Sequence, residues 1–419
     1  MLRRRSRALS LAQRLHAQYL IVGAGDAGVS LARVLLRRGM ADQPERVKLL
    51  DAARGYVYQS GQTKVALGML RLGDVLRPNR ARLPRNAVQL ETRAHRVHAA
   101  EGFVECEDGR EIAYDHLVLA SGVEPDFDCV RGLAEALYDP DVPAATCYVP
   151  FLARKYAALR RAFTGGTALF CQPPPPTKCP GATQKVMYVS AQDWRGLPAR
   201  VEFHTPEQRL LGPEYFHRAL LRVAEGYGVA LAFGSELVEV RAGERVAVLR
   251  QAEGPREVQF DLLHASPAYR PGEYIARSGL ASATGYADVD PATLRHRRFP
   301  NVWALGDAAD LPTAKTLAAV NDQIHVVADN LLASRTGGAM HRYSGYTACP
   351  VLVDKNRVLL AEYNYNHELM PSLHKKPRPS LLAGFLYKHV FRLMTLYGLN
   401  IYFRQMRLLR HALLHRFAI

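Results

Sequence analysis

The stretch QYLIVGAGDAGVSLARVLL, residues 18–36, decides the fold prediction. Its apolar run predicts a buried strand, and Gly23, Gly25 and Gly28 then open a helix. In this pattern the first glycine allows a tight turn, the second lets the backbone approach a pyrophosphate, and the third allows close packing of helix on strand. The N-terminus of the helix also favours negative charge. We therefore predict a dinucleotide-binding turn.

A carboxylate stands where such a turn needs one. The next apolar run, residues 47–50, ends at Asp51, which follows Gly28 by 23 positions. An acid at this distance binds a ribose hydroxyl in dinucleotide-binding folds.

A second signature lies near residue 300, in RRFPNVWALGDAADLPTAKTLAAV, residues 297–320. An apolar strand runs into Gly306 and Asp307 and then into a helix, an arrangement similar to the flavin-binding segment of flavoproteins with two dinucleotide folds. In those proteins the Asp bonds the ribityl chain. Taken alone, this pair could be an ordinary strand-to-helix turn capped by Asp. The strand before Gly122, in YDHLVLASGVEPDF, adds a third element of the same pattern.

The second α/β domain lacks the matching nicotinamide fingerprint. Its first strand begins near Thr167 and continues into CQPPPPTKCPGATQKVMY. Proline has no amide hydrogen and a fixed backbone dihedral, so the run 173–176 cannot form an amide-lined phosphate turn. We therefore expect an electron donor other than NADH.

The predicted fold class is α/β, with two Rossmann-like dinucleotide-binding domains and a C-terminal membrane-associating helical segment. A chain of 419 residues with 48% hydrophobic residues is long enough for two or three domains. We expect a targeting presequence over 1–17, an FAD-binding domain over 18–135 and 280–335, a second domain over 136–279, and an interface and membrane segment over 336–419.

Four segments together resemble sulfide:quinone oxidoreductases of the mitochondrial type. They are residues 178–185 (KCPGATQK), residues 343–350 (YSGYTACP), the Tyr58-Gln59 pair and the Gly-Asp segment. The likeness runs from about residue 18 to about residue 365. The chain departs from the family at Ser60 and Gln62, where Pro and Trp are common, and at Pro180, where a small residue is usual.

The resemblance implies a site. Two cysteines, Cys179 and Cys349, would meet at the flavin as the redox centre, with Lys185 as a candidate cation beside them. No metal is implied. The cofactor is FAD, and the implied FAD-binding residues are Gly23, Gly25, Asp26, Ala27, Gly28, Asp51, Gln59, Ala94, Gly122, Asp307 and Lys315.

The other cysteines have a simpler interpretation. The six are too scattered for a disulfide framework and show no Cys-x-x-Cys spacing. We expect Cys106, Cys129 and Cys147 to be small buried residues. The same is expected of Cys171, although it lies close in sequence to Cys179.

The implied chemistry has sulfide and a quinone as partners. Sulfide attacks a bridge between the two cysteines as any thiolate would, leaving a persulfide on Cys349 and a sulfur anion on Cys179. Electrons then pass through FAD to the quinone. Glutathione, sulfite or a second sulfide would remove the sulfane sulfur.

Charge is concentrated at the two ends of this chain of net charge +16. The first residues hold five arginines and no acid before Asp26, which resembles a mitochondrial presequence; the alternative is a basic tail. After Glu368 there is no acid, and Arg404, Arg407 and His411 share a helical spacing among apolar residues. Such a segment suits an anionic membrane surface. The alternative is a helical pair docked on its own domain or in a homodimer, and no nucleic-acid motif accompanies the basic residues.

The predicted location is the mitochondrial inner membrane, peripherally bound, with a bacterial cytoplasmic membrane as the alternative. Three other functions remain open. A type II NADH:quinone oxidoreductase would need the missing fingerprint, and a flavocytochrome sulfide dehydrogenase subunit would need a haem partner. A protein that binds no flavin would follow if Ser60 and Gln62 spoil the site.

Overall fold

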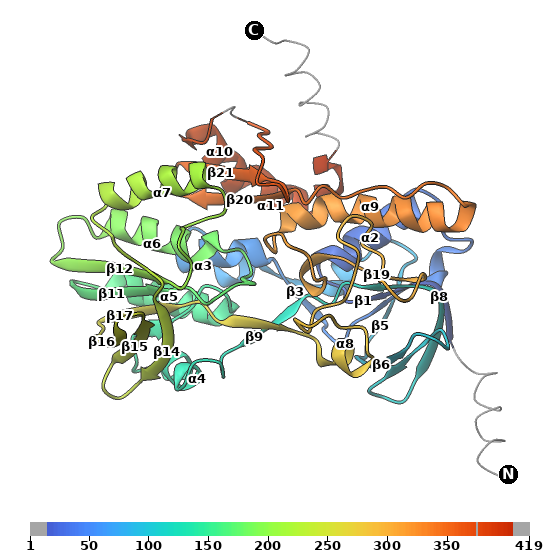
Figure 1. Ribbon diagram of the computed structural model, residues 1–419, viewed down its shortest axis with the longest axis horizontal. Helices are drawn as coiled ribbons and strands as arrows, with labels where there is room; N and C mark the ends of the chain where they lie inside the picture. The colour runs from blue at the N-terminus through green and yellow to red at the C-terminus, as the bar shows by residue number, and fades with distance from the viewer. Residues whose placement is uncertain (1–14, 374–375, 405–419) are drawn as a thin grey trace, which may run out of the picture.

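The computed structural model describes residues 15–373 and 376–404, and two sheets, the first mixed and the second parallel, organise them (Figure 1). The first sheet has the order β5-β2-β1-β8-β7-β6, with β19 paired to β8. Its strands are β1 (Leu15–Val22), β2 (Val47–Leu50), β5 (Val88–Leu90), β6 (Ala94–His98), β7 (Phe103–Cys106), β8 (Glu111–Leu119) and β19 (Val302–Ala304).

Strand β1 is central because it is apolar on both faces. Residues 17–22 are all buried, as expected of a strand with parallel neighbours and helices on its sides. Helices α2 (Asp26–Arg37) and α9 (Leu317–Thr336) pack together over the sheet. The strand begins at Leu15, which pairs with Ile112, so the folded domain starts three residues earlier than the predicted boundary at 18. The rest of the predicted presequence lies outside the described residues.

The second sheet has the order β10-β17-β11-β12-β13, and all its pairs are parallel. Its strands are β10 (Ala144–Ala145), β11 (Gly166–Cys171), β12 (Ala199–Thr205), β13 (Ala230–Phe233) and β17 (Leu262–Ala265). The helices of this domain are α4 (Leu133–Tyr138), α5 (Pro150–Ala162), α6 (Gly181–Asp193) and α7 (Glu214–Gly226). An antiparallel sheet of β14 (Glu236–Arg241), β15 (Val246–Gln251) and β16 (Gly254–Gln259) adjoins it.

The two α/β domains lie side by side and are joined by a pair of crossing strands (Figure 1). These are β9 (Val123–Asp126) and β18 (Ala268–Pro271), which pair antiparallel. Shorter elements complete this part: β3 (Gly55–Val57), β4 (Leu76–Pro78), α3 (Gln62–Ala66) and α8 (Glu273–Arg277). The α/β prediction with two Rossmann-like domains is confirmed.

A third layer forms from the C-terminal residues. Strands β20 (Thr347–Leu352), β21 (Val358–Tyr363) and β22 (Pro379–Ser380) pair antiparallel and are followed by α10 (Leu381–Phe385), a π-turn (Leu386–Val390) and α11 (Phe391–Leu396). Tyr387 packs with Leu67, Val189 and Leu352 in one apolar cluster. Among the described residues, no helix has the length and apolarity needed to cross a bilayer. Arg407 and His411, predicted to share a helical face with Arg404, lie outside the described residues.

Candidate active site

The turn between β1 and α2 leaves no room for side chains at two of its glycines. Gly23 has φ +110°, and a Cβ there would lie 2.4 Å from the carbonyl oxygen of Ala120. A Cβ on Gly28 would lie 1.9 Å from the carbonyl oxygen of Gly23. Gly25 differs, since a Cβ there would meet nothing within 4 Å. The open side of the turn is therefore at Gly25, where the pattern expects a pyrophosphate.

Asp51 is hydrogen-bonded to the glycine turn through its carboxylate. Its carboxylate oxygens accept hydrogen bonds from the amides of Ala24 (2.7 Å) and Ala53 (2.8 Å). The carboxylate that was predicted to meet a ribose thus lies directly beside the predicted pyrophosphate turn. Gly122, at the end of β8, has φ +71° and open space around its Cβ position. The structure places three other predicted FAD-binding positions as follows: Ala27 lies in the first turn of α2 beside Gly306, Ala94 lies at the start of β6, and Gln59 is exposed before α3.

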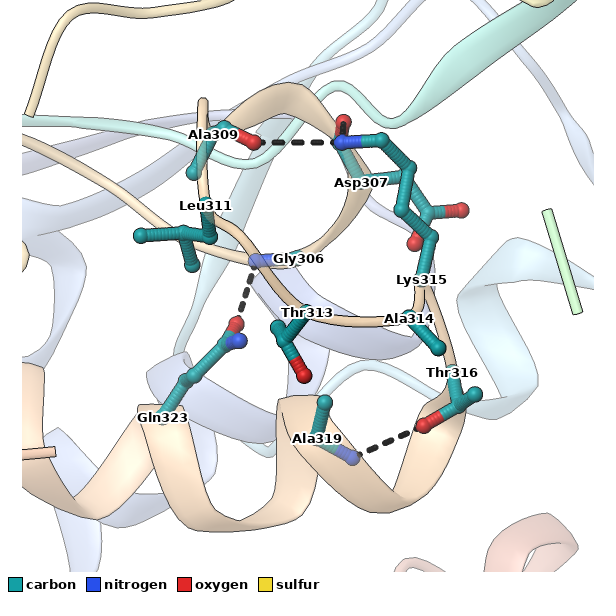
Figure 2. A pocket seen from close by; sticks show the side chains of 10 residues that line it. All are labelled: Gly306, Asp307, Ala309, Leu311, Thr313, Ala314, Lys315, Thr316, Ala319 and Gln323. Atoms are coloured by element: carbon teal, nitrogen blue, oxygen red, sulfur yellow. Dashed lines mark hydrogen bonds between the residues drawn. The ribbon is translucent and has the colours of Figure 1, made fainter. Parts of the chain in front are cut away.

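A pocket opens at the second signature (Figure 2). The ammonium of Lys315 reaches back across the loop and donates to the carbonyl oxygens of Asp307 (2.8 Å) and Ala309 (3.1 Å) (Figure 2). On the other side, the Gln323 side chain accepts from the amide of Gly306 at 2.7 Å. Burial lowers the pKa of Lys315 to about 8. The helix that closes the pocket, α9, begins at Leu317 rather than directly after Asp307, because a 3-10 turn and an extended loop intervene.

The two predicted redox cysteines meet. Their Sγ atoms lie 3.9 Å apart, about twice the S–S distance of a disulfide. Cys179 stands just before α6 with φ +47°, and Cys349 lies inside β20. Close approach depends on Gly181, because a Cβ there would lie 2.5 Å from the Sγ of Cys349.

The pair is electrically asymmetric. The Nζ of Lys185, one turn into α6, lies 3.5 Å from the Sγ of Cys179. A hydrogen bond from Cys349 and the charge of Lys185 lower the pKa of Cys179 to about 6, against the effect of burial. The hydrogen bond to Cys179 and burial raise the pKa of Cys349 well above its usual value. Of the two sulfurs, Cys179 is therefore the one that more readily carries negative charge.

Lys178 and Tyr148 join the sulfur pair to the pocket. The Nζ of Lys178 lies 3.1 Å from the Oδ2 of Asp307, and the amide of Cys179 donates to the carbonyl oxygen of Lys315 at 3.1 Å. The hydroxyl of Tyr148 donates to the carbonyl oxygen of Cys179, also at 3.1 Å. These contacts fix Cys179 beside the Gly306–Gln323 pocket.

The remaining cysteines follow the prediction in part. Cys106, Cys147 and Cys171 are buried. Cys129 is exposed, so the expectation that it is buried was wrong; its thiol donates to the carbonyl oxygen of Asp126 in a turn after β9. Burial raises the pKa of Cys147, and so does the charge of Cys179. The cysteine that adjoins the redox pair is therefore Cys147 and not Cys171, which was closer in sequence.

Three features of the chain fit FAD. The open Cβ position at Gly25 faces a helix N-terminus, the second signature lines a pocket, and the cysteine pair adjoins that pocket. When bound, FAD would supply a two-electron acceptor beside the cysteine pair.

Comparison with known proteins agrees with this geometry. The family described as pyridine nucleotide-disulphide oxidoreductase matches residues 17–144. The mitochondrial sulfide:quinone oxidoreductase of Schizosaccharomyces pombe is 35% identical over 375 residues, which is 84% of this chain and 82% of that protein. The Mus musculus protein of the same name is 30% identical, covering 84% of this chain and 78% of the relative. The chain belongs to the sulfide:quinone oxidoreductase family.

Family membership confirms the resemblance inferred from the sequence, the assignment as an oxidoreductase and FAD as the cofactor. Solved structures support the fold. The sulfide:quinone oxidoreductase of Aquifex aeolicus has a TM-score of 0.78 at 16% identity and covers 96% of this chain and 95% of its own. A ferredoxin reductase from Rhodopseudomonas palustris has a TM-score of 0.60 at 18% identity, covering 82% of this chain and 81% of its own.

Two contributors to the site were not predicted from the sequence. Lys178 stands beside Cys179 in the quoted motif, but its sequence position does not show that it meets Asp307, more than a hundred residues away. Tyr148 precedes α5 in a proline-containing linker and is aimed at Cys179 only by the tertiary fold. No local signal marked either one.

Proposed function

We propose that this protein oxidises hydrogen sulfide to sulfane sulfur through Cys179 and Cys349 and passes the electrons by way of FAD to a membrane quinone. The observation that carries the proposal is the 3.9 Å separation of the two sulfurs, with the Nζ of Lys185 3.5 Å from the Sγ of Cys179. Sulfide and quinone are named in the relatives that cover most of the chain.

The asymmetry of the pair gives the first step its direction. In the oxidised protein, hydrosulfide attacks the Cys349 sulfur of the bridge, a new S–S bond forms there, and the bond to Cys179 breaks. Thiol–disulfide exchange is faster when the leaving thiol has a low pKa. Lys185 stabilises the leaving thiolate, so Cys179 keeps the electron pair and Cys349 becomes the persulfide.

Lys185 remains charged through this step. Burial lowers its pKa, but Cys179 and Tyr387 raise it well above its ordinary value. The ammonium can therefore hold a sulfur anion in place beside the Gly306–Gln323 pocket. Cys349 is only 1% exposed, and hydrosulfide is small enough to reach a sulfur at such a position.

Removal of the sulfane sulfur closes the cycle. A second nucleophile such as glutathione, sulfite or another sulfide takes the outer sulfur of the Cys349 persulfide, and the Cys349 thiol returns. Loss of two electrons from the two thiols then restores the bridge, and these electrons are the ones that reach the quinone. FAD supplies the acceptor for them when it is bound.

The C-terminal layer is the proposed membrane contact. Several large apolar side chains there are exposed, and they stand near the cations Lys388 and Arg392: Leu381, Leu382, Phe385, Leu393, Tyr397, Leu399 and Tyr402. Such a mixture suits the surface of an anionic bilayer. The matched relatives are named as mitochondrial proteins, so the proposed membrane is that of a mitochondrion, most simply the inner one.

The deciding experiment mixes the oxidised holoenzyme anaerobically with sulfide and follows the flavin absorbance. Sulfide should bleach the flavin within the time of turnover, whereas NADH at the same concentration should leave it oxidised. Bleaching by NADH and not by sulfide would replace this function with that of an NADH:quinone oxidoreductase.

A further inference from the structure

The first residue of helix α2 presents an electrostatic problem. Asp26 follows Gly25 directly, so its carboxylate stands in the first turn of the helix that accepts the pyrophosphate. The partial positive charge of a helix N-terminus favours anions, but a diphosphate and a carboxylate at the same end repel each other. Retention of FAD therefore needs a cation at this place.

Arg82 meets the carboxylate from a distant part of the chain. Its Nη2 lies 2.6 Å from the Oδ1 of Asp26, and the hydroxyl of Tyr56 donates to the same oxygen at 2.8 Å. The guanidinium carbon lies 3.3 Å above the ring centroid of Tyr56. The Arg82 side chain is only 3% exposed. The buried side chains of Arg82 and Tyr56 and the half-buried carboxylate of Asp26 thus form one unit beside the turn.

Some guanidinium N–H groups beside the turn have no hydrogen-bond acceptor among the described residues. The Nε and Nη1 atoms of Arg82 are buried and have no hydrogen-bond partner among the described residues. The Nη1 of Arg33 is in the same condition, while the Nη2 of Arg33 donates to the carbonyl oxygen of Arg82. Buried guanidinium donors left without an acceptor are costly, so an unpaired group of this kind points to a missing anion.

The local charges also do not balance. Arg33 and Arg82 bring two positive charges to one carboxylate, that of Asp26. Burial and the nearby charge of Arg82 together lower the pKa of Arg33 to about 10. Two cations forced together in a buried place are stabilised by a ligand that carries negative charge.

We propose that Arg82 binds the diphosphate of FAD with its free N–H groups while it neutralises Asp26. A guanidinium suits this double role because its planar fork offers several donors in fixed directions. Arg82 becomes a cofactor-binding residue in addition to the glycine turn, and Tyr56 acts as the platform that holds its plane. The proposal concerns FAD retention alone and stands apart from the sulfide and quinone chemistry.

The experiment follows FAD release from the holoenzyme after dilution into flavin-free buffer, by the rise in flavin fluorescence. Arg82→Met should release FAD about 10- to 100-fold faster, since hydrogen bonds to charged groups contribute about 1.5–3 kcal/mol and 1.4 kcal/mol corresponds to tenfold. Arg80→Met, at an exposed position in the same segment, is the matched control and should leave release unchanged.

Two further variants separate phosphate binding from mere neutralisation of the carboxylate. Asp26→Asn removes the repulsion between the carboxylate and the diphosphate. Adding Arg82→Met to this variant therefore tests only the direct contact between Arg82 and the diphosphate. This double variant also leaves no unpaired buried carboxylate and is expected to fold. The double variant should release FAD at least about tenfold faster than Asp26→Asn alone, as loss of a charged hydrogen bond requires. Equal release by the two would overturn the proposal.

Discussion

The Sγ atoms of Cys179 and Cys349 lie 3.9 Å apart although 170 positions separate them in the chain. One comes from the loop before α6 and the other from β20, and Gly181 lets the strand approach the start of the helix. Neither the start of α6 nor strand β20 needs a cysteine pair in order to form. We assign the redox role to the cysteine pair because it lies beside the Gly306–Gln323 pocket.

The first prediction concerns the pair itself. Cys179→Ser and Cys349→Ser should each keep FAD and lose sulfide-dependent quinone reduction by on the order of 10³-fold or more, because groups that act as a unit fail together. The double variant should be little worse than either single one. Steady-state quinone reduction measures this, with Cys147→Ser as the buried neighbouring control, which should keep most of its activity. Near-normal turnover in either single variant would contradict the proposed two-cysteine mechanism.

A second prediction concerns the thiolate. In the reduced protein, alkylation of Cys179 by iodoacetamide should increase as pH rises through about 6, since only the thiolate reacts. Lys185→Met removes a cation 3.5 Å from the sulfur and should move this midpoint upward by about 1 to 3 pH units. Mass spectrometry of the peptide that carries Cys179 follows the reaction. An unchanged midpoint in Lys185→Met would show that Lys185 does not stabilise the thiolate.

A third prediction separates binding from folding at the glycine turn. Gly25→Val places its side chain in open space, so the variant should fold but carry little FAD, because the new side chain occupies the side that faces the pyrophosphate. Gly28→Val should fail earlier, since its Cβ would overlap the carbonyl oxygen of Gly23. Flavin content per folded protein and the circular dichroism spectrum distinguish the two. A full, tightly bound flavin complement in Gly25→Val would contradict the assignment.

Local patterns were enough to predict much of the fold. The strand over 19–22, the glycine turn and Asp51 lie within one short segment whose conformation depends on near neighbours, and each is found where it was expected. The predicted start of the folded domain was late by three residues, because Leu15 gains its place by pairing with Ile112 in β8. Pairing with a distant strand leaves no signal in the sequence around residue 15.

Burial was harder to predict than secondary structure. The segment QTKVA, residues 62–66, contains three polar residues, yet all five residues of α3 are buried, and the helix packs against α5 and α6. A helix of five residues is too short for its hydrophobic period to be visible. Cys129 was expected to be buried but is exposed, in the turn after β9 where its thiol donates to the carbonyl oxygen of Asp126.

A fourth prediction follows from the buried Lys64. Burial, together with the nearby charges of Lys185, Arg392 and Lys388, lowers the pKa of Lys64 to about 7, and its Nζ donates to the carbonyl oxygen of Tyr387 at 2.6 Å. An unfolded lysine has a pKa of about 10.4. Between these values the unfolded chain binds one more proton, so this residue should make stability rise by about 1.4 kcal/mol per pH unit.

Lys64→Leu should remove that dependence. The variant should be more stable than the wild type by on the order of 3–5 kcal/mol below pH 7, and the gain should vanish towards pH 10.5. Urea unfolding of the holoenzyme at several pH values gives the difference between the two proteins. Lys376→Leu, at an exposed position, should show no such trend. A difference that does not vary with pH would show that Lys64 is charged in the folded protein.

The last prediction concerns the membrane. Deleting everything after Pro379 would be a poor test, because Ala383 and Tyr387 belong to a packed cluster with Leu67 and Val189. Substitution of exposed residues avoids this damage. Leu381 is 66% exposed, Phe385 55% and Tyr397 74%, so replacing all three by Ser should leave the fold intact.

The triple Ser variant should bind liposomes with anionic lipid at least about tenfold more weakly, since even partial loss of three apolar anchors exceeds 1.4 kcal/mol. Sulfide should still reduce its FAD, and a water-soluble short-chain quinone should still be reduced, whereas transfer to a long-chain quinone in the bilayer should fall. The control replaces Tyr138, Phe151 and Leu197, which are exposed apolar residues of the second domain, and should bind like the wild type. Liposome sedimentation measures all three proteins, with high salt weakening the wild type through Lys388 and Arg392. Undiminished binding by the first variant would assign this surface to packing against another protein.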